Sequence, residues 1–209
     1  MRMRKKKNIV PRMEAVKSYL LESAADIPLD ENIYLEVGCG KGTFICTMAK
    51  RHPERQFVAV EKVESVILLA MEKAKAQEIS NLRFFKGDVM ELANLEREHF
   101  CDRIFLNFSD PWPRGRHAKR RLTADSFLSL YKKLLSEDGD IHMKTDNTEL
   151  FDFSLETFPQ NGFELDKVTR DLHKNPPHDN IMTEYEQNFV SQGKPICRLE
   201  AKIKAEKNK

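Results

Sequence analysis

The chain has 209 residues, of which 40% are apolar and 33% are charged, and its formal net charge at pH 7 is only +2. This length suits one domain with one hydrophobic core, so we expect residues 1–209 to form a single domain. Residues 1–12 are expected to be a basic N-terminal arm of that domain. The longest apolar stretch, 63–71, contains Glu64 and is too short to cross a bilayer, so we expect no membrane span. No apolar segment follows the basic N-terminus, so we expect no secretory signal and a cytoplasmic location.

The spacing of apolar residues predicts helices and strands that alternate along most of the chain. We expect helices over 13–25, 43–51, 64–77, 123–135 and 148–158, with Thr123 as the N-cap of the fourth. We expect strands over 33–37, 56–60, 82–85, 102–108, 140–144, 163–168 and 196–203, with a long polar segment before the last strand.

The alternation from residue 33 to residue 158 is typical of parallel βαβ units. It predicts an α/β fold with a doubly wound, mostly parallel, seven-stranded sheet of the Rossmann-like type. In such sheets a ligand binds beyond the carboxyl ends of the strands. Unusual polar residues gather at those ends, namely Glu36, Glu61, Asp88, Asp110 and Asp146.

Cysteines and histidines show no spacing that is typical of a metal site or a disulfide framework. The four cysteines form no C-x-x-C pair, and the six histidines form no H-x-H or H-x-x-x-H pair. We therefore expect reduced thiols and no metal centre.

Basic residues are concentrated in two segments despite the low net charge. Residues 2–12 hold six basic side chains and no acidic one, and residues 114–121 hold five basic side chains together with His117. A single run of this kind is usually a solvated surface, but two runs in one small chain favour a polyanionic partner. The arm over 2–12 either clamps such a partner or is a disordered end.

A glycine-rich loop, Glu36-Val37-Gly38-Cys39-Gly40-Lys41-Gly42, follows the first strand of the alternating region and leads into a helix. Glycines at alternate positions let the backbone turn tightly and leave space for a ligand. The acid at Glu36 would repel a pyrophosphate but would attract the ammonium and sulfonium of S-adenosylmethionine. The loop therefore predicts an S-adenosylmethionine site, and a nicotinamide dinucleotide site is the alternative.

Acids after the next two strands fit the same cofactor. Glu61 is placed to accept hydrogen bonds from two ribose hydroxyls, and Asp88 to receive the adenine amino group. Taken singly, Gly38 and Gly42 are also explained by a tight turn, and Glu61 by capping of the helix that follows it. The whole set in register favours a cofactor site.

The fourth strand of that region is followed by Asn107-Phe108-Ser109-Asp110-Pro111-Trp112-Pro113. Prolines stiffen such a loop, and the aromatic side chain can stack on a base. Acid-proline-aromatic motifs at this position serve methyl transfer to nitrogen, and the alternative is an ordinary turn with a buried tryptophan.

At this point the chain resembles the bacterial tRNA (guanine-N7-)-methyltransferase family. The resemblance rests on the glycine loop, Glu61-Lys62, Gly87-Asp88, the run from Asn107 to Pro113 with Arg116-His117 after it, Lys144-Thr145-Asp146, and Thr183-Glu184-Tyr185-Glu186. It implies methylation of N7 of guanosine 46 in the variable loop of tRNA, with tRNA as the partner and S-adenosylmethionine as the donor. Whether the chain is a monomer or a homodimer stays open.

The resemblance also implies roles for individual residues. Glu36, Gly38, Gly40, Glu61, Asp88 and Asp110 match cofactor-binding positions, and Asp110 matches the catalytic acid. Arg114, Asp146, Thr183, Glu184, Tyr185 and Glu186 match substrate-binding positions, and Arg116, His117, Lys119, Arg120 and Arg121 match an RNA-contact segment. Family members usually carry lysine where this chain has Arg114, which keeps the charge and changes the geometry of the contact.

The chemistry of guanine N7 fits these residue types. N7 has a free in-plane lone pair, so its methylation needs placement and relief of positive charge and no general base. We therefore expect Asp110 to orient the base and stabilise the transition state. Asp146 is also explained as the N-cap of the helix over 148–158, and Glu184 and Glu186 as solvated surface residues.

Three other functions are compatible with parts of the pattern. One is an exocyclic-amine methyltransferase that acts on another RNA, on DNA or on protein. The others are a nucleotide-sensing or RNA-binding module that is not an enzyme, and a dehydrogenase.

Overall fold

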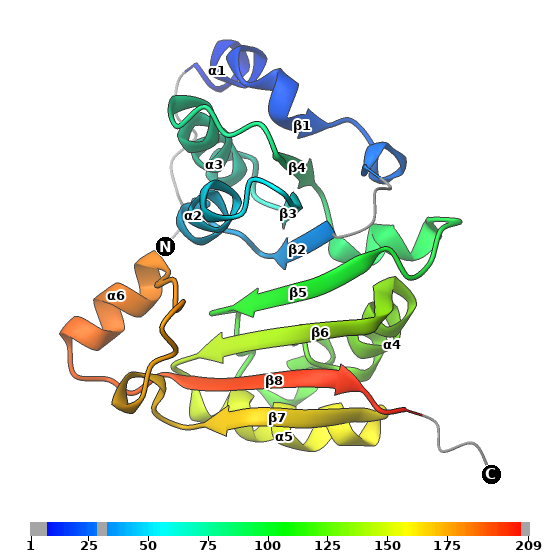
Figure 1. Ribbon diagram of the computed structural model, residues 1–209, viewed down its shortest axis with the longest axis vertical. Helices are drawn as coiled ribbons and strands as arrows, with labels where there is room; N and C mark the ends of the chain where they lie inside the picture. The colour runs from blue at the N-terminus through cyan, green and yellow to red at the C-terminus, as the bar shows by residue number, and fades with distance from the viewer. Residues whose placement is uncertain (1–7, 29–32, 206–209) are drawn as a thin grey trace.

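The computed structural model describes residues 8–28 and 33–205, and they form an α/β fold built on one sheet (Figure 1). The strand order is β1-β4-β3-β2-β5-β6-β8-β7. Pairing is parallel from β1 to β6, and β8 runs antiparallel to both β6 and β7. The strands are β1 (Leu20–Leu21), β2 (Ile33–Val37), β3 (Gln56–Glu61), β4 (Leu82–Lys86), β5 (Cys101–Asn107), β6 (Leu135–Thr145), β7 (Phe163–Thr169) and β8 (Cys197–Ile203).

Helices cover both faces of the sheet, which confirms the doubly wound α/β prediction. The α-helices are α1 (Ile9–Ala15), α2 (Thr43–Arg51), α3 (Glu64–Ala76), α4 (Asp125–Leu134), α5 (Thr148–Gln160) and α6 (Glu184–Ser191). The short 3₁₀ helices are η1 (Lys17–Tyr19), η2 (Ala24–Asp26), η3 (Val89–Asn94), η4 (Gly115–Arg120) and η5 (Leu172–Lys174). Among the described residues, no helix is both long enough and apolar enough to cross a bilayer.

Alternate strand residues pack into two separate cores. Leu35 and Ile104 belong to the core beneath α4 and α5, whereas Tyr34 and Phe105 belong to the core beneath α2 and α3. Glu36 follows the same alternation as Tyr34 and is 2% exposed, so the fold buries a carboxylate at the end of a central strand.

The N-terminal region differs from its predicted helix over 13–25. The helix α1 ends at Ala15, and Leu20 and Leu21 then pair in parallel with Phe84 and Phe85 of β4. An extended pair of leucines extends the sheet at its edge, so tertiary packing overrides local helical spacing here. Within residues 8–28 and 33–205 the sheet therefore has eight strands, where the sequence predicted seven.

Two further boundaries differ from prediction. The helix α4 has Ala124 as its N-cap, because Thr123 is buried and its Oγ1 lies 2.8 Å from Ser154 Oγ of α5. The strand β6 starts at Leu135, directly after α4. The segment between β7 and β8, which we expected to be a long polar segment, contains α6.

Candidate methyl-transfer site

A cavity of about 1080 Å³ opens at the carboxyl ends of the parallel strands. Its wall contains the glycine loop, the ends of β3 and β5, the turn after β4, and the start of α6. In Figure 1, α6 lies beside the arrowheads of β5 and β6, although it is remote from them in sequence. The topology thus brings the predicted cofactor residues and part of the predicted substrate segment to one edge of the sheet.

Glu36 presents a buried carboxylate to this cavity. Its Oε1 accepts a hydrogen bond of 3.0 Å from Asn107 Nδ2, and its Oε2 is buried without a hydrogen-bond partner among the described residues. Burial raises the pKa of Glu36 to about 8, although Asn107 and the charge of Lys144 oppose this shift. A buried acid with an unsatisfied oxygen is a receptor for a cationic or hydrogen-donating group.

The glycine loop provides open backbone next to Glu36. Gly38 and Gly40 have φ of +77° and +57°, and a Cβ on either residue would meet no atom within 4 Å. Gly42 is different, because a Cβ there would lie 2.7 Å from Ala70 Cβ of α3. The first two glycines therefore leave space at the cavity, and the third allows α2 and α3 to pack closely.

Glu61 fixes the glycine loop from the end of β3. Its Oε2 accepts a hydrogen bond of 3.2 Å from Gly40 N–H, and its Oε1 accepts one of 2.9 Å from Val63 N–H. Each oxygen retains a lone pair, so the carboxylate can still accept hydroxyl donors. Val63 is the N-cap residue of α3, so the alternative of helix capping describes only part of what Glu61 does.

Asp88 lies at the same edge and caps η3 by accepting a hydrogen bond of 3.0 Å from Met90 N–H. Its other oxygen lies 2.7 Å from Lys62 Nζ. Burial alone would raise the pKa of Asp88, but Lys62 and the Met90 N–H outweigh it and lower that pKa below its ordinary value. Asp88 is therefore an ionised acceptor on the cavity wall.

The run from Asn107 to Pro113, at the end of β5, is called the reaction loop below. Its backbone is irregular and is held in place by neighbouring side chains. Phe108 and Trp112 adopt positive φ of +51° and +43°, which costs about 1–3 kcal/mol per residue when the side chain is not glycine. Arg121 opposes this cost, because its Nε donates to Pro111 O at 2.9 Å and its Nη2 to Trp112 O at 3.3 Å. Asp110 is exposed on the cavity wall, and its carboxylate forms no hydrogen bond or ion pair within the described residues.

The predicted RNA-contact segment divides into exposed and buried residues. Arg114, Arg116, Lys119 and Arg120 are exposed, and the Arg120 guanidinium lies 4.9 Å from the centre of the Trp112 ring. Arg121 is only 8% exposed, and its two hydrogen bonds to Pro111 O and Trp112 O show that it holds the reaction loop. Lys119 and Arg120 line the cavity, whereas Arg114, Arg116 and His117 lie outside its wall.

The predicted substrate segment from Thr183 to Glu186 begins α6. Thr183 caps the helix by accepting a hydrogen bond of 2.9 Å from Glu186 N–H, and Tyr185 is 61% exposed and stacks on Phe108 with ring centres 6.2 Å apart. Thr183, Glu184 and Tyr185 line the cavity.

Glu186 points the other way and is fully buried. Its carboxylate accepts hydrogen bonds from Lys144 Nζ at 3.0 Å, and its other oxygen lies 2.9 Å from His173 Nε2. The alternative interpretation of Glu186 as a solvated surface residue is therefore wrong, and Glu186 is not part of the cavity wall. It anchors α6 to β6.

Asp146 is half-buried after β6 and lies outside the cavity wall. The alternative interpretation of Asp146 as a helix cap is wrong, because Asn147 caps α5 by accepting a hydrogen bond of 2.7 Å from Leu150 N–H. The basic arm lies largely outside the described residues. Its described residue Arg12 donates to Glu72 of α3 at 2.7 and 2.6 Å, so Arg12 fixes α1 to the domain.

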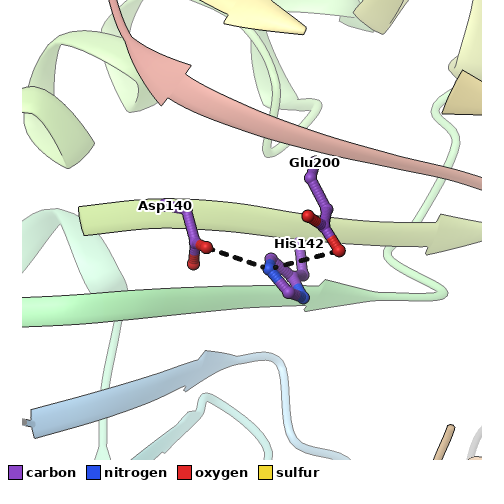
Figure 2. Close-up of side chains that lie close together, drawn as sticks. All are labelled: Asp140, His142 and Glu200. Atoms are coloured by element: carbon purple, nitrogen blue, oxygen red, sulfur yellow. Dashed lines mark hydrogen bonds and ion pairs between the residues drawn. The ribbon is translucent and has the colours of Figure 1, made fainter. Parts of the chain in front are cut away.

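A second polar cluster lies across β6 and β8 and involves Asp140, His142 and Glu200, shown in Figure 2. His142 Nε2 lies 3.2 Å from Asp140 Oδ2 and 3.6 Å from Glu200 Oε1. Both carboxylates already have cationic partners, with Arg103 on Asp140 and Lys167 and Arg198 on Glu200. These cations outnumber the carboxylates, so a divalent ion would be repelled and the cluster is a structural ion-pair network.

Three residues that build the site lie in the quoted motifs, but sequence reasoning gave them no individual role. Asn107 donates to Glu36, Lys144 fixes α6, and Lys41 lies 3.2 Å from Glu184 Oε2. Asn107 and Lys144 are paired near the carboxyl ends of neighbouring strands, and that position is the signal that could have identified their roles.

Comparisons with known proteins show which family the chain resembles. Residues 30–199 match a family model described as "Putative methyltransferase". A tRNA (guanine-N(7)-)-methyltransferase of Brevibacillus brevis is 50% identical over 170 residues, which cover 81% of this chain and 79% of that protein. The protein of the same name from Streptococcus sanguinis is 42% identical and the match covers 96% of this chain and 99% of that protein.

Solved structures show the same fold at low sequence identity. The antibiotic-resistance methyltransferase Kmr superposes with a TM-score of 0.57 at 17% identity, covering 88% of this chain and 94% of that one. A precorrin-6y C5,15-methyltransferase from Geobacter metallireducens superposes with a TM-score of 0.59 at 13% identity, covering 97% and 93%. The two relatives at 50% and 42% identity are similar over most of the chain, so the chain belongs to the tRNA (guanine-N7-)-methyltransferase family.

Proposed function

We propose that the protein transfers a methyl group from S-adenosylmethionine to N7 of guanosine 46 in the variable loop of tRNA, forming 7-methylguanosine. The relatives that carry the name tRNA (guanine-N(7)-)-methyltransferase support the reaction class. The single observation that supports S-adenosylmethionine as the donor is the buried oxygen of Glu36, which has no hydrogen-bond partner among the described residues and belongs to a residue of the cavity wall.

The residues present fit this donor. Glu36 would receive the ammonium, open backbone at Gly38 and Gly40 would accommodate the methionine portion, and Glu61 retains lone pairs for ribose hydroxyls. Asp88 would accept the adenine amino group. When bound, S-adenosylmethionine supplies a methyl group on a cationic sulfur, which is electrophilic enough for transfer to a ring nitrogen.

On the substrate side, Asp110 is exposed in the cavity and free of protein partners in the described part of the chain. Because N7 is already a nucleophile, the tasks left to the chain are placement, worth up to about 7–11 kcal/mol, and stabilisation of the positive charge that develops on the purine. We infer that Asp110 performs the second task and helps with the first. Arg114, Asp146, Thr183 and Tyr185 remain candidates for contacts to the nucleotide.

The exposed residues Arg116, Lys119 and Arg120 support contacts to phosphates beside the reaction loop. The stacked pair of Arg120 and Trp112 also offers a flat surface for a base. These contacts would make tRNA affinity fall steeply with salt.

The direct test is incubation of the purified protein with unmodified tRNA and methyl-labelled S-adenosylmethionine, followed by nucleoside analysis. We expect label in 7-methylguanosine at position 46, and the Asp110→Asn variant should bind the donor normally while its turnover falls. Label in an exocyclic methylamine would replace the N7 assignment, and undiminished turnover of Asp110→Asn would remove the role given to that residue.

A further inference from the structure

Glu184, the first residue of α6, lies on the cavity wall and contacts two ammonium groups and one hydroxyl group. Its Oε1 accepts hydrogen bonds from Thr43 Oγ1 at 2.6 Å and from Lys73 Nζ at 3.1 Å. Its Oε2 lies 3.2 Å from Lys41 Nζ. The hydrogen bond from Thr43, with further contributions from the two lysines, lowers the pKa of Glu184 to about 2, so this carboxylate is ionised throughout the physiological pH range.

The three groups around Glu184 come from the glycine loop, α2 and α3, which we call the cofactor half of the molecule. Lys41 lies in the glycine loop, Thr43 is the first residue of α2, and Lys73 comes from α3, where it also donates to Thr43 Oγ1. The positive end of the α2 dipole adds to the charge of the two ammonium groups. Together they form a receptor for one carboxylate, which we call the Lys41–Thr43–Lys73 receptor.

A second observation indicates what external ligand this receptor would take. The same cavity contains Glu36, which is 2% exposed and has an oxygen without a partner among the described residues. Glu36, Lys41 and Thr43 line one continuous cavity. An acceptor for a cation and a receptor for a carboxylate in one cavity suit an α-amino-acid group, which carries ammonium and carboxylate on the same carbon.

We propose that the Lys41–Thr43–Lys73 receptor binds the α-carboxylate of the methyl donor and that Glu184 occupies this receptor as an internal competitor when the donor is absent. This inference rests on the proposed use of S-adenosylmethionine. It gives Glu184 a role opposite to that of a binding residue, because its charge opposes entry of the donor. Displaced Glu184 would be released from the cofactor half and become free to face the substrate.

The surroundings of Glu184 allow this exchange without unfolding of α6. Glu186, two residues later, stays bonded to Lys144, and Tyr185 stacks on Phe108 of the reaction loop. The Glu184 side chain is 41% exposed, so it can rotate into solvent when another carboxylate replaces it. Donor binding would thus change one side chain at the start of the substrate segment and leave the helix in place.

The test is isothermal titration calorimetry on the full chain with two probes, S-adenosylhomocysteine and 5′-methylthioadenosine. Both contain the adenosyl thioether, but only the first has the amino-acid group. Glu184→Gln removes the charge and keeps the shape, and we expect it to bind S-adenosylhomocysteine about two- to five-fold more tightly, with unchanged affinity for 5′-methylthioadenosine. Lys73→Met should weaken binding of S-adenosylhomocysteine by a similar factor and also leave 5′-methylthioadenosine unaffected.

Matched controls come from exposed ion pairs away from the cavity. Asp152→Asn removes a carboxylate paired with Arg170, and Lys17→Met removes an ammonium paired with Glu22. Neither should alter the affinity for either probe. Circular dichroism of each variant would verify that it is folded.

The outcomes separate this inference from the proposed function. Weaker or unchanged binding of S-adenosylhomocysteine by Glu184→Gln would overturn the competitor role, and equal loss of both probes would identify Glu184 as a general support of the cavity. Failure of the unaltered protein to bind either probe would instead refute the donor itself and the receptor with it.

Discussion

The ammonium of Lys144 lies 3.0 Å from Oε2 of Glu186 in the interior of the protein, where it joins the end of β6 to the start of α6. Lys144 Nζ also donates to Asn180 Oδ1 at 2.6 Å and to Ile181 O at 3.0 Å. Its backbone carbonyl accepts a hydrogen bond from Phe108 N–H at 2.8 Å. One residue therefore fixes the reaction loop through its backbone and the substrate segment through its side chain.

Lys144→Met should be strongly destabilising, because it leaves the fully buried Glu186 carboxylate without its ammonium partner. We expect a loss of about 3–5 kcal/mol in the free energy of unfolding. Asp152→Asn, which breaks the exposed pair with Arg170, should cost less than about 1 kcal/mol. Urea denaturation measures both, and equal losses would contradict the assignment of Lys144 as the buried anchor.

Glu36 predicts a pH dependence of donor binding. Its pKa is raised from 4.5 to about 8, so the empty folded protein holds a proton at pH 7 that the unfolded chain releases. The stability contributed by this group is present below pH 4.5 and is lost as the pH rises through about 8. Because Lys144 and Glu61 both face Glu36, their charges help to set this value.

A cationic donor would favour ionised Glu36, so its binding near pH 7 should release a proton and strengthen as the pH rises toward 8. Calorimetry in two buffers with different ionisation enthalpies measures the protons released. We expect Glu36→Gln to bind more weakly and to release none at this site. Release of the same number of protons by Glu36→Gln would contradict the prediction.

Arg121 and its neighbours should respond differently to substitution. Arg121→Met removes the two hydrogen bonds that hold Pro111 and Trp112, so it should lower turnover while the salt dependence of tRNA binding stays unchanged. Arg116→Ala combined with Lys119→Ala should weaken tRNA binding and reduce the slope of log K against log salt by about 1.8 for two lost phosphate contacts on a duplex. Filter binding over a range of salt concentrations distinguishes the two effects.

Substitutions of the loop glycines should distinguish a glycine needed for helix packing from one that leaves space for the donor. Gly42→Ala would place a Cβ 2.7 Å from Ala70 Cβ at positive φ, so we expect a clear loss of thermal stability. Gly38→Ala meets no atom within 4 Å and should carry only a backbone cost of about 1 kcal/mol, together with weaker donor binding. Thermal unfolding with and without S-adenosylhomocysteine tests both, and a Gly42→Ala variant as stable as Gly38→Ala would contradict the packing argument.

Local sequence determined the central α/β units and the positions of the acids at the strand ends. Apolar runs such as 33–37 and 56–60 are buried strands regardless of their neighbours, and a glycine loop between such a strand and a helix has few alternative conformations. The predicted cofactor residues Glu36, Gly38, Gly40, Glu61 and Asp88 consequently lie on one cavity wall.

Tertiary structure decided the features that depend on partners distant in sequence. Arg121 and Arg120 are adjacent and chemically identical, yet one is buried against the reaction loop and the other is exposed. Glu184 and Glu186 are separated by two positions on α6, which turns their side chains in different directions, toward Lys41 and Lys73 in one case and toward Lys144 in the other. The sequence of a charged segment specifies which charges it carries, but the partner of each charge is set by which strands and helices the fold brings beside it.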